Sequence, residues 1–466
     1  MTIFFQDLKE INERIEKRDI NICVIGVGTI GLPLATMLAK KGFNVKGLDI
    51  SQDRVELINS GEVIFEYQDI LKEVTGKTLL ATTDPEIAIE NIDVIFVCVP
   101  TPLNDKNEMD NSNLESVVQR IHSFLQKGML LIFESSVAIG TTSKISKLIE
   151  EKTEMVFGED LGLAYCPERY NPTPMKKYST DKEYNIESKG ETFTVDKISR
   201  VIGGIDNKSS EISKLIYSQF ITTGITILSS IEAAESTKLV ENIFRDVNIA
   251  LVNEFAKIFP KFNLDIFEII NAAKTKPFAF MPHYPGAGVG GECIPVDTWY
   301  LISQAEQIGL NTELMRMARK VNDSMPKFMI ELLQIELEKR GKQLENSKIS
   351  ILGLCYKKNV PDIRLSPSLE IINLLKNKQV NYQICDPIFQ DIKSKYNLIP
   401  LSDIFKDADA ILLVTEHDMF KKIDFAEIKK QMKTPIIVDG RNFFSEKDLT
   451  SLGFSYTAIG KPLVEI

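Results

Sequence analysis

The sequence of 466 residues has no apolar run that approaches the roughly 18 residues needed by a membrane-spanning helix. Its beginning also lacks the pattern of a secretory signal, because acidic residues and lysines occupy the stretch from Asp7 to Lys17, where such a signal would be apolar. We therefore expect a cytoplasmic protein that has no membrane partner.

Histidine is scarce and the cysteines are not paired in the sequence. The chain has three histidines and six cysteines, and no group of them has the spacing of a metal site. Several cysteines lie in apolar runs such as Ile92–Val99, which is typical of small core residues in a reducing compartment. We expect no bound metal.

Basic residues are fewer than acidic residues, and the excess of negative charge gives a formal net charge of -10. This excess disfavours general binding to nucleic acid or to anionic membranes, and phosphate groups would have to be bound by a local site. A content of 44% hydrophobic and 26% charged residues is that of a folded globular protein. The length indicates about two to four domains.

The first part of the chain has the pattern of a β-α-β unit. Residues 21–27 form an apolar strand pattern that is followed by a glycine turn, a helical segment over 32–41 and a second strand over 44–50. Later apolar strands at 94–99 and 130–133 predict a doubly wound parallel sheet. We assign residues 1–212 to this domain, and the polar segment 173–198 to a surface insertion within it.

Two further domains are expected after residue 212. The apolar spacing becomes helical, which predicts a central helical domain over 213–325. A second alternation of strands and helices then predicts a Rossmann-like domain over 326–466, in which Asp407–Thr415 resembles Asn91–Val99. The expected fold class is α/β, with two Rossmann-like doubly wound domains joined by a central helical domain.

A dinucleotide fingerprint follows the first strand. Its glycine turn opens a helix, so backbone amides and the positive helix end can approach a pyrophosphate. Asp49 ends the next strand, where it would bind ribose hydroxyls and repel a 2′-phosphate, which favours NAD over NADP. The alternative is a tight turn with a solvated aspartate. The candidate NAD-binding residues are Gly26, Gly28, Thr29, Ile30, Gly31, Asp49, Arg54, Thr101 and Ser136.

A second glycine-rich stretch runs from Pro285 to Asp297 and surrounds Cys293. Glycines on the N-terminal side of a cysteine provide a close backbone cradle and favour a nucleophilic role for the thiol. A buried cysteine in a loop is the alternative, and it is the more common situation when no other signal is present.

Three other segments carry polar side chains at positions where functional residues can lie: on one helix face, after a strand, and in a loop before a helix. A helix is predicted over 232–258, with Glu235, Lys238, Asn242 and Arg245 on one face, although such a face is usually only solvated. Cys166-Pro-Glu-Arg169 follows a predicted strand. The loop from Tyr356 to Ser368 carries Lys357 and Arg364 ahead of a helix that Ser366 would cap and Pro367 would begin. The apolar face of the predicted helix consists of Val240, Ile243, Phe244, Val247 and Leu251.

In this order after a dinucleotide fingerprint, the four segments resemble the UDP-glucose/GDP-mannose dehydrogenase family over essentially the whole chain. They are most similar to the branch that oxidises UDP-N-acetylhexosamines, including UDP-N-acetyl-D-mannosamine. The resemblance implies an NAD-dependent four-electron oxidation of the sugar C6 alcohol to a carboxylate. Cys293 would hold a thiohemiacetal and then a thioester, which water would hydrolyse.

The resemblance also implies roles for individual residues. Lys238 would favour the thiolate and stabilise oxyanions together with Asn242. Glu168 and Asp297 would activate water and transfer protons, with the division between them left open. Arg364 would lie at a phosphate or at the cofactor. The UDP-sugar would be bound by Arg169, Arg245, Gly288, Gly290, Gly291 and Lys357, in a homodimer built through the central helices.

Three positions depart from the family pattern: Glu292 stands in place of His or Ser, Ala287 in place of Pro, and Thr298 in place of Pro. Several alternatives therefore stay open. One is the same chemistry on UDP-glucose, UDP-N-acetylglucosamine, UDP-N-acetylgalactosamine or GDP-mannose. Another is a two-electron alcohol dehydrogenase that makes one NADH per sugar. The third is a non-catalytic nucleotide-sugar-binding protein.

Overall fold

The computed structural model describes residues 2–63, 67–169, 194–389 and 396–462, so most of the predicted insertion at 173–198 lies outside the described residues. The described chain forms two compact units. One contains residues up to 169 together with 194–241 and 299–310, and the other contains 242–298 and the described residues from 311 onward.

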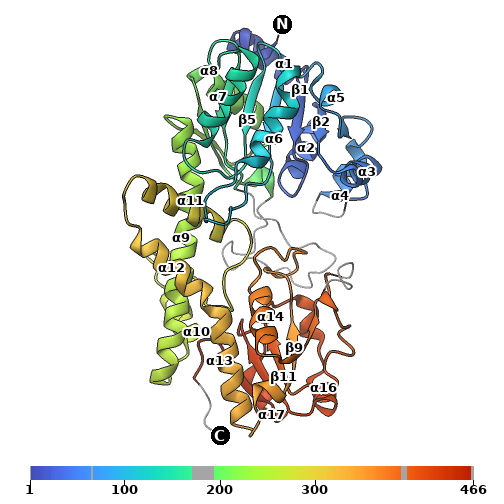
Figure 1. Cartoon of the computed structure of the whole chain (residues 1–466). Coiled ribbons are helices and arrows are strands. Elements are labelled where there is room, and N and C mark those ends of the chain that lie inside the picture. Colours follow the sequence, from blue (N-terminus) through green and yellow to red (C-terminus); the bar gives the residue numbers. More distant parts are fainter. Residues whose placement is uncertain (1, 64–66, 170–193, 390–395, 463–466) are drawn as a thin grey trace. The chain divides into compact units, whose positions relative to one another are not determined.

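The first unit is built on an eight-stranded sheet with the order β3-β2-β1-β4-β5-β6-β7-β8 (Figure 1). Strands β1 to β6 run parallel, and the order reverses between β1 and β4, as in dinucleotide-binding folds. Val24 packs into one apolar core with α2 and α8, whereas Cys23 and Ile25 pack into another with α6 and α7, so both faces are covered. The strands are β1 (Asn21–Ile25), β2 (Asn44–Leu48), β3 (Leu79–Thr82), β4 (Val94–Val97), β5 (Leu130–Phe133), β6 (Gly162–Tyr165), β7 (Arg200–Gly204) and β8 (Ile225–Ile227), and the helices are α1 (Leu8–Glu16), α2 (Gly31–Lys40), α3 (Gln52–Ser60), α4 (Gln68–Val74), α5 (Pro85–Ile89), α6 (Ser112–Ile121), α7 (Thr141–Thr153) and α8 (Asn207–Tyr217).

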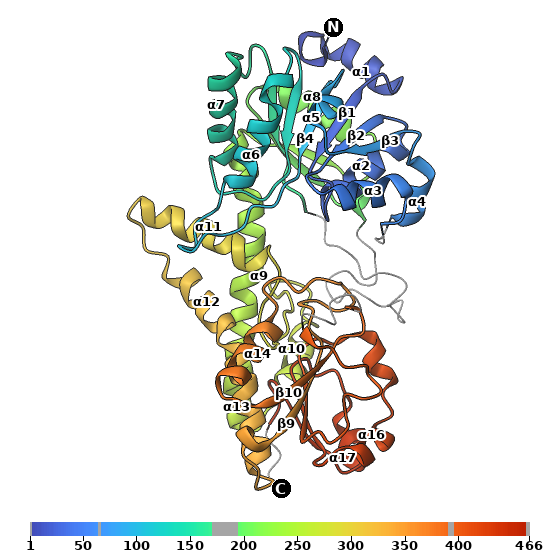
Figure 2. The same cartoon turned by 45° about the vertical axis from the view of Figure 1, so that its right-hand side comes forward.

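The second unit contains a five-stranded parallel sheet with the order β10-β9-β11-β12-β13 (Figure 2). Helices α13 and α14 pack on one face, and α16 and α17 pack on the other. As predicted, Ser366 caps α14 and Pro367 begins it. The strands are β9 (Lys348–Leu352), β10 (Asn381–Cys385), β11 (Ala410–Leu413), β12 (Ile436–Asp439) and β13 (Ser455–Ala458), and the helices are α14 (Pro367–Asn377), α16 (Phe425–Gln431) and α17 (Glu446–Ser451).

The two sheets repeat the same turn after their first strand. Gly26 has φ 84 and Gly353 has φ 91, a backbone conformation that glycine adopts without strain. A Cβ atom on Gly26 would lie 2.7 Å from the Cys98 carbonyl oxygen, and a Cβ atom on Gly353 would lie 2.6 Å from the Thr415 carbonyl oxygen. Both glycines are therefore needed where the chain crosses the neighbouring strand.

The similarity between 91–99 and 407–415 also has a structural basis. Asn91 and Asp407 both have φ 56, and each is followed two residues later by an aspartate. The carboxylate of Asp93 accepts the first N–H of β1 at 3.0 Å, and that of Asp409 accepts the first N–H of β9 at 2.9 Å. The predicted pair of Rossmann-like domains is thus confirmed.

The predicted helix over 232–258 is confirmed as α9 (Ile231–Ile258), but the burial of its two faces differs from the usual pattern. Its polar side chains Glu235, Lys238 and Asn242 are buried, whereas Val240 is 63% exposed and Phe244 is 47% exposed. The alternative of a merely solvated polar face is therefore wrong. The other central helices are α10 (Ile266–Ala273), α11 (Ile294–Gln307), α12 (Glu313–Asp323) and α13 (Met325–Glu338). Among the described helices, none combines the length and apolar character needed to cross a membrane.

Candidate active site

The turn between β1 and α2 fits a pyrophosphate. A Cβ on Gly31 would collide with the carbonyl oxygen of Gly26, so packing requires both glycines. A Cβ on Gly28 would meet only the Arg54 guanidinium, at 3.4 Å. Gly28 therefore leaves room above the loop, and the backbone around Thr29 and Ile30 leads into the N-terminus of a ten-residue helix, which favours an anion.

Asp49 lies beside this turn, at the carboxyl end of β2. Its carboxylate accepts hydrogen bonds from the N–H groups of Val27 at 3.1 Å and Ser51 at 3.0 Å. These bonds hold the carboxylate at the glycine loop, where it is only partly buried. This is the position at which an acidic residue contacts a ribose in dinucleotide-binding folds.

Thr101 and Ser136 follow β4 and β5 and meet each other. The Thr101 hydroxyl donates to the Ser136 carbonyl oxygen at 2.5 Å, and the Tyr300 hydroxyl donates to the Thr101 carbonyl oxygen. Both predicted residues therefore lie at the carboxyl ends of the strands, on the same side of the sheet as Gly26.

In the first unit, Lys238 and Glu168 are also brought together. Lys238 is buried in α9, and its ammonium donates to the backbone carbonyl of Glu168. The Glu168 carboxylate pairs with the Arg200 guanidinium at 3.0 Å. Arg169 pairs with Glu241 of α9 at 2.6 Å. The Cys-Pro-Glu-Arg loop is thus attached to the helix that carries Lys238.

In the second unit, Asn242 and Asp297 form a buried pair. The Asn242 amide donates to the Asp297 carboxylate, and the Arg245 guanidinium donates to the Asn242 side-chain oxygen. Asn242 is 2% exposed and Asp297 is 1% exposed. Their hydrogen bonds hold the first turn of α11 against α9.

Cys293 immediately precedes α11. Its carbonyl oxygen accepts the Asp297 N–H at 3.0 Å, which closes the first turn of the helix. Cys293 is exposed, whereas the other five cysteines are buried, as expected for core residues. A thiol at the N-terminus of a helix is placed where the helix dipole favours its thiolate.

The glycines before Cys293 pack against the loop that follows β9. A Cβ at Gly290 or Gly291 would lie 2.7 Å from the Tyr356 side chain, and Gly288 packs against Pro367. The Gly291 N–H donates to the Arg364 carbonyl oxygen at 3.0 Å. The predicted cradle is therefore a close contact between two loops. Lys357 is the next residue after Tyr356 and is partly buried.

Arg364 pairs with carboxylates on both loops. Its guanidinium lies 2.6 Å from Asp362 and also pairs with Glu292. Burial raises the pKa of Glu292, with Asp362 adding to the effect and Arg364 opposing it. The Glu292 carboxylate is thus turned to Arg364, which it shares with Asp362.

Two residues at the glycine cradle were missed by the sequence reasoning. A Cβ at Gly286 would lie 2.5 Å from the Arg441 guanidinium, which is held by the Val414 carbonyl oxygen at 3.0 Å. The Gly286 N–H donates to the Asn253 side-chain oxygen at 3.0 Å. The position of Arg441 in an Asp-Gly-Arg sequence at the end of β12 was the available signal, because ligands bind at the carboxyl ends of such strands.

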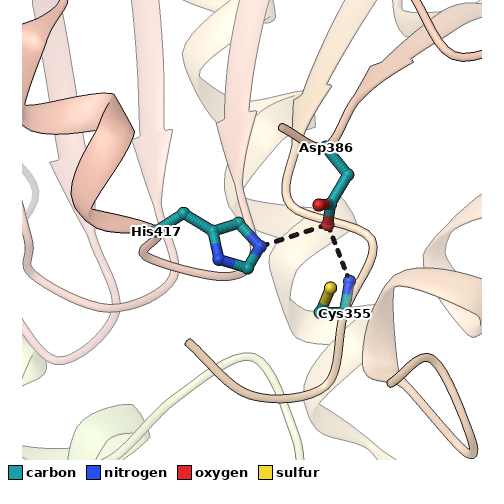
Figure 3. Close-up of side chains that lie close together, drawn as sticks. All are labelled: Cys355, Asp386 and His417. Carbon is teal, nitrogen blue, oxygen red and sulfur yellow. Dashed lines mark hydrogen bonds and ion pairs between the residues drawn. The ribbon is translucent and has the colours of Figure 1, made fainter. Parts of the chain in front are cut away.

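Cys355, Asp386 and His417 lie close enough to suggest a metal site, with their ligand atoms within 4.8 Å of one another (Figure 3). However, His417 Nδ1 accepts the Asn359 N–H at 2.9 Å, which places the imidazole proton on Nε2. That nitrogen faces the Asp386 carboxylate at 3.1 Å and has no lone pair for a metal. Burial also raises the pKa of the Cys355 thiol, and Asp386 adds to this. Hydrogen bonds therefore account for the cluster.

Comparison with known proteins agrees with this geometry. The sequence matches three domains of the UDP-glucose/GDP-mannose dehydrogenase family: the NAD binding domain over residues 20–221, the central domain over 232–324 and the UDP binding domain over 350–446.

Similar proteins match over almost their full length. The UDP-N-acetyl-D-mannosamine dehydrogenase of Methanococcus aeolicus is 36% identical, with 96% of this chain and 97% of that protein covered. The UDP-N-acetyl-D-glucosamine 6-dehydrogenase of Pseudomonas aeruginosa is 31% identical, with 93% and 99% covered. The structure of the Pyrococcus horikoshii UDP-D-ManNAc dehydrogenase matches with a TM-score of 0.84 and 34% identity, covering 96% of this chain and all of that one. The chain thus belongs to the UDP-glucose/GDP-mannose dehydrogenase family and is an NAD-dependent nucleotide-sugar dehydrogenase.

Proposed function

We propose that the chain oxidises the C6 alcohol of UDP-N-acetyl-D-mannosamine to the carboxylate of the uronic acid, with Cys293 as nucleophile. The sugar is taken from the names of full-length relatives. The nucleophile rests on one observation above all: Cys293 is the exposed cysteine, and it stands at the N-terminus of α11.

Cys293 acts on the aldehyde stage of the reaction. Its Sγ adds to the C6 carbonyl and forms a C–S bond, which gives a thiohemiacetal and then, after the second oxidation, a thioester. Water breaks the C–S bond and returns the electron pair to sulfur as the thiolate. In total one alcohol and one water become a carboxylate, two hydrides and three protons.

Four polar residues support these steps in the proposed mechanism. Lys238 and Asn242 donate hydrogen bonds to the oxygen that becomes negative as sulfur or water adds to the carbonyl. Glu168 and Asp297 take protons from the reacting alcohol and water. The buried contacts of Lys238 with the Glu168 backbone, and of Asn242 with Asp297, hold these groups in place within their own units.

The cofactor site is assigned to residues at the carboxyl ends of the strands in the eight-stranded sheet. NAD, when bound there, supplies the hydride acceptor for both oxidations. Gly26, Gly28 and Gly31 bring backbone N–H groups to the pyrophosphate, and Asp49 accepts hydrogen bonds from ribose hydroxyls. Thr29, Ile30, Arg54, Thr101, Ser136 and Arg364 stay candidates for the same site.

The substrate site is assigned to the second sheet and the glycine cradle. Arg441 joins Arg245 and Lys357 as a cation for the diphosphate or the sugar. Gly288, Gly290 and Gly291 bring backbone close to the ligand, and Arg169 is the corresponding candidate from the first unit. The division into 1–212, 213–325 and 326–466 follows these roles and remains a prediction.

The exposed apolar side of α9 supports a homodimer through the central helices. Val240, Phe244 and Leu251 share this side, and each is at least 45% exposed. A second copy of the chain would bury them, because contiguous apolar patches mark interfaces. Cytoplasmic location remains a prediction of the same kind.

Glu292 motivated a non-catalytic alternative, and its geometry weakens that alternative. Because the carboxylate pairs with Arg364, its charge beside Cys293 is partly offset by a cation. The substrate proposal is tested by measuring kcat/KM with NAD for UDP-N-acetyl-D-mannosamine, UDP-N-acetyl-D-glucosamine, UDP-N-acetyl-D-galactosamine, UDP-glucose and GDP-mannose. The mannosamine derivative should have the highest value. A higher value for another sugar would reassign the substrate, and binding without turnover of any sugar would favour the non-catalytic alternative.

A further inference from the structure

Glu168 belongs to a buried cluster of ionisable groups in the first unit. Glu134 follows β5, Glu168 follows β6, Arg200 begins β7 and Tyr217 ends α8. Glu134 is 1% exposed and Glu168 is 4% exposed, while Arg200 and Tyr217 are fully buried. The mechanism above uses only Glu168 from this group.

Two cations face the two carboxyl groups: Arg200, and Lys238, whose ammonium donates to the Glu168 backbone carbonyl. The Arg200 guanidinium pairs with Glu168 at 3.0 Å, and the Tyr217 hydroxyl donates to Glu134 Oε1. If both carboxyl groups were ionised, Glu134 would hold a buried negative charge that none of the salt bridges among the described residues compensates directly, which is unfavourable. Ionisation of the second carboxyl group is therefore displaced toward neutral pH.

Glu134 is the carboxyl group whose ionisation is displaced. Its Oε2 is buried and accepts no bond from a described donor, while the Glu134 and Glu168 carboxyl groups are within hydrogen-bond reach of each other, a contact that requires one of the two to carry a proton. Burial raises the pKa of Glu134 to about 7, with Glu168 adding to the effect, and Arg200 and Tyr217 opposing it. Glu134 thus changes charge in the range in which an enzyme of this kind works.

The remaining titratable neighbours do not compete for the proton. Cys98 and Cys166 face the same cluster and are buried, and burial raises the pKa of both thiols well above neutrality. Burial also raises the pKa of the Tyr217 hydroxyl. These three groups are therefore neutral.

We propose that Glu134 is a proton store for Glu168, so that the two carboxyl groups work as one proton-sharing pair. When water attacks the thioester, its O–H bond breaks and the proton forms a bond with the Glu168 carboxylate. The proton then passes to the ionised Glu134 carboxylate, and Glu168 is ionised again. This inference rests on the proposed role of Glu168 in water activation. Glu134 itself acts through Glu168 and does not touch the substrate.

The first test uses the full-length protein without substrate. Infrared spectroscopy during a pH titration should detect one buried carboxylic acid that ionises near neutrality. Glu134→Gln should remove this signal, because the amide has the same shape and no proton to lose. Glu336→Gln is the matched control: Glu336 is also buried, in α13 of the other unit, and the signal should persist in this variant.

The second test is the pH dependence of turnover with UDP-N-acetyl-D-mannosamine and NAD. At about pH 6, where Glu134 is protonated, kcat of Glu134→Gln should be within about twofold of wild type, whereas at about pH 8.5 it should be about tenfold lower. KM should not change. A purely structural role would lower kcat by the same factor at both values.

Three results would overturn the proposal: no ionising acid in the wild type, a signal that persists in Glu134→Gln, or a pH-independent loss of kcat. If Glu134→Gln does not fold, Tyr217→Phe replaces it. Loss of the phenol hydroxyl should move the infrared ionisation to higher pH, and an unchanged midpoint would contradict the pair. If wild type turns over no nucleotide sugar, the proposed function fails, and the infrared titration alone then decides whether the pair shares a proton.

Discussion

Replacement of Arg319 by Met should strongly destabilise the central helices. Arg319 of α12 is 3% exposed, and its guanidinium lies 2.6 Å from the Asp246 carboxylate of α9, which is fully buried. The Asn322 amide also donates to this carboxylate, at 2.7 Å. Without the guanidinium, a buried carboxylate would keep only neutral donors.

The expected loss for Arg319→Met is about 3–5 kcal/mol in the free energy of unfolding, the cost of leaving one partner of a buried ion pair alone. The double variant Asp246→Asn/Arg319→Met removes the uncompensated charge and should recover about half of this or more. Burial raises the pKa of Asp246 even with Arg319 opposing it, so protonation of this carboxyl favours the folded state. The destabilisation should therefore be smaller at acidic pH and grow as pH rises.

Urea unfolding followed by circular dichroism and by the fluorescence of Trp299, the only tryptophan, measures these effects. Because the chain has more than one unit, the transition that reports the central helices must be separated from the other. The reasoning would be refuted if Arg319→Met lost less than about 1 kcal/mol, the range of an exposed pair, or if the double variant were no more stable than the single one.

Two further predictions concern the cofactor and the assembly. Asp49→Ala should raise the KM for NAD by about tenfold, the effect of losing roughly 1.4 kcal/mol of hydrogen bonding, while the KM for the nucleotide sugar changes little; equal effects on both would remove Asp49 from the cofactor site. Phe244→Glu should convert a dimer into monomers in light scattering after gel filtration, because a charge would be buried in the proposed interface, whereas a dimer that tolerates Glu there would place the interface elsewhere.

Much of the fold could be predicted because its signals are local. The helix over 232–258 and the strands at 21–27, 44–50, 94–99 and 130–133 follow from apolar periodicity within each segment, and the turn at Gly26 follows from its glycines. The family assignment required only the order of short motifs. The helices, strands, turn and motif order can be predicted without knowing which distant segments pack against each other.

The environment of several side chains could not be predicted in this way. Lys238 on the polar face of α9 is buried against Glu168, 70 positions earlier in the sequence, and Asp246 is paired with Arg319, 73 positions later. Glu292 is paired with Arg364, 72 positions away. The pKa of Glu134 depends on Arg200, which begins β7, and on Glu168, which follows β6. Such charge pairings depend on tertiary contacts that periodicity does not encode.

The most direct test of the account is the amount of NADH formed per UDP-N-acetyl-D-mannosamine consumed, in wild type and in Cys293→Ala. The account predicts two NADH per sugar and a uronate product for wild type. The variant should form no uronate, because it lacks the thiol that forms the thioester. One NADH per sugar in wild type would contradict the four-electron oxidation, and two in the variant would contradict the role of Cys293.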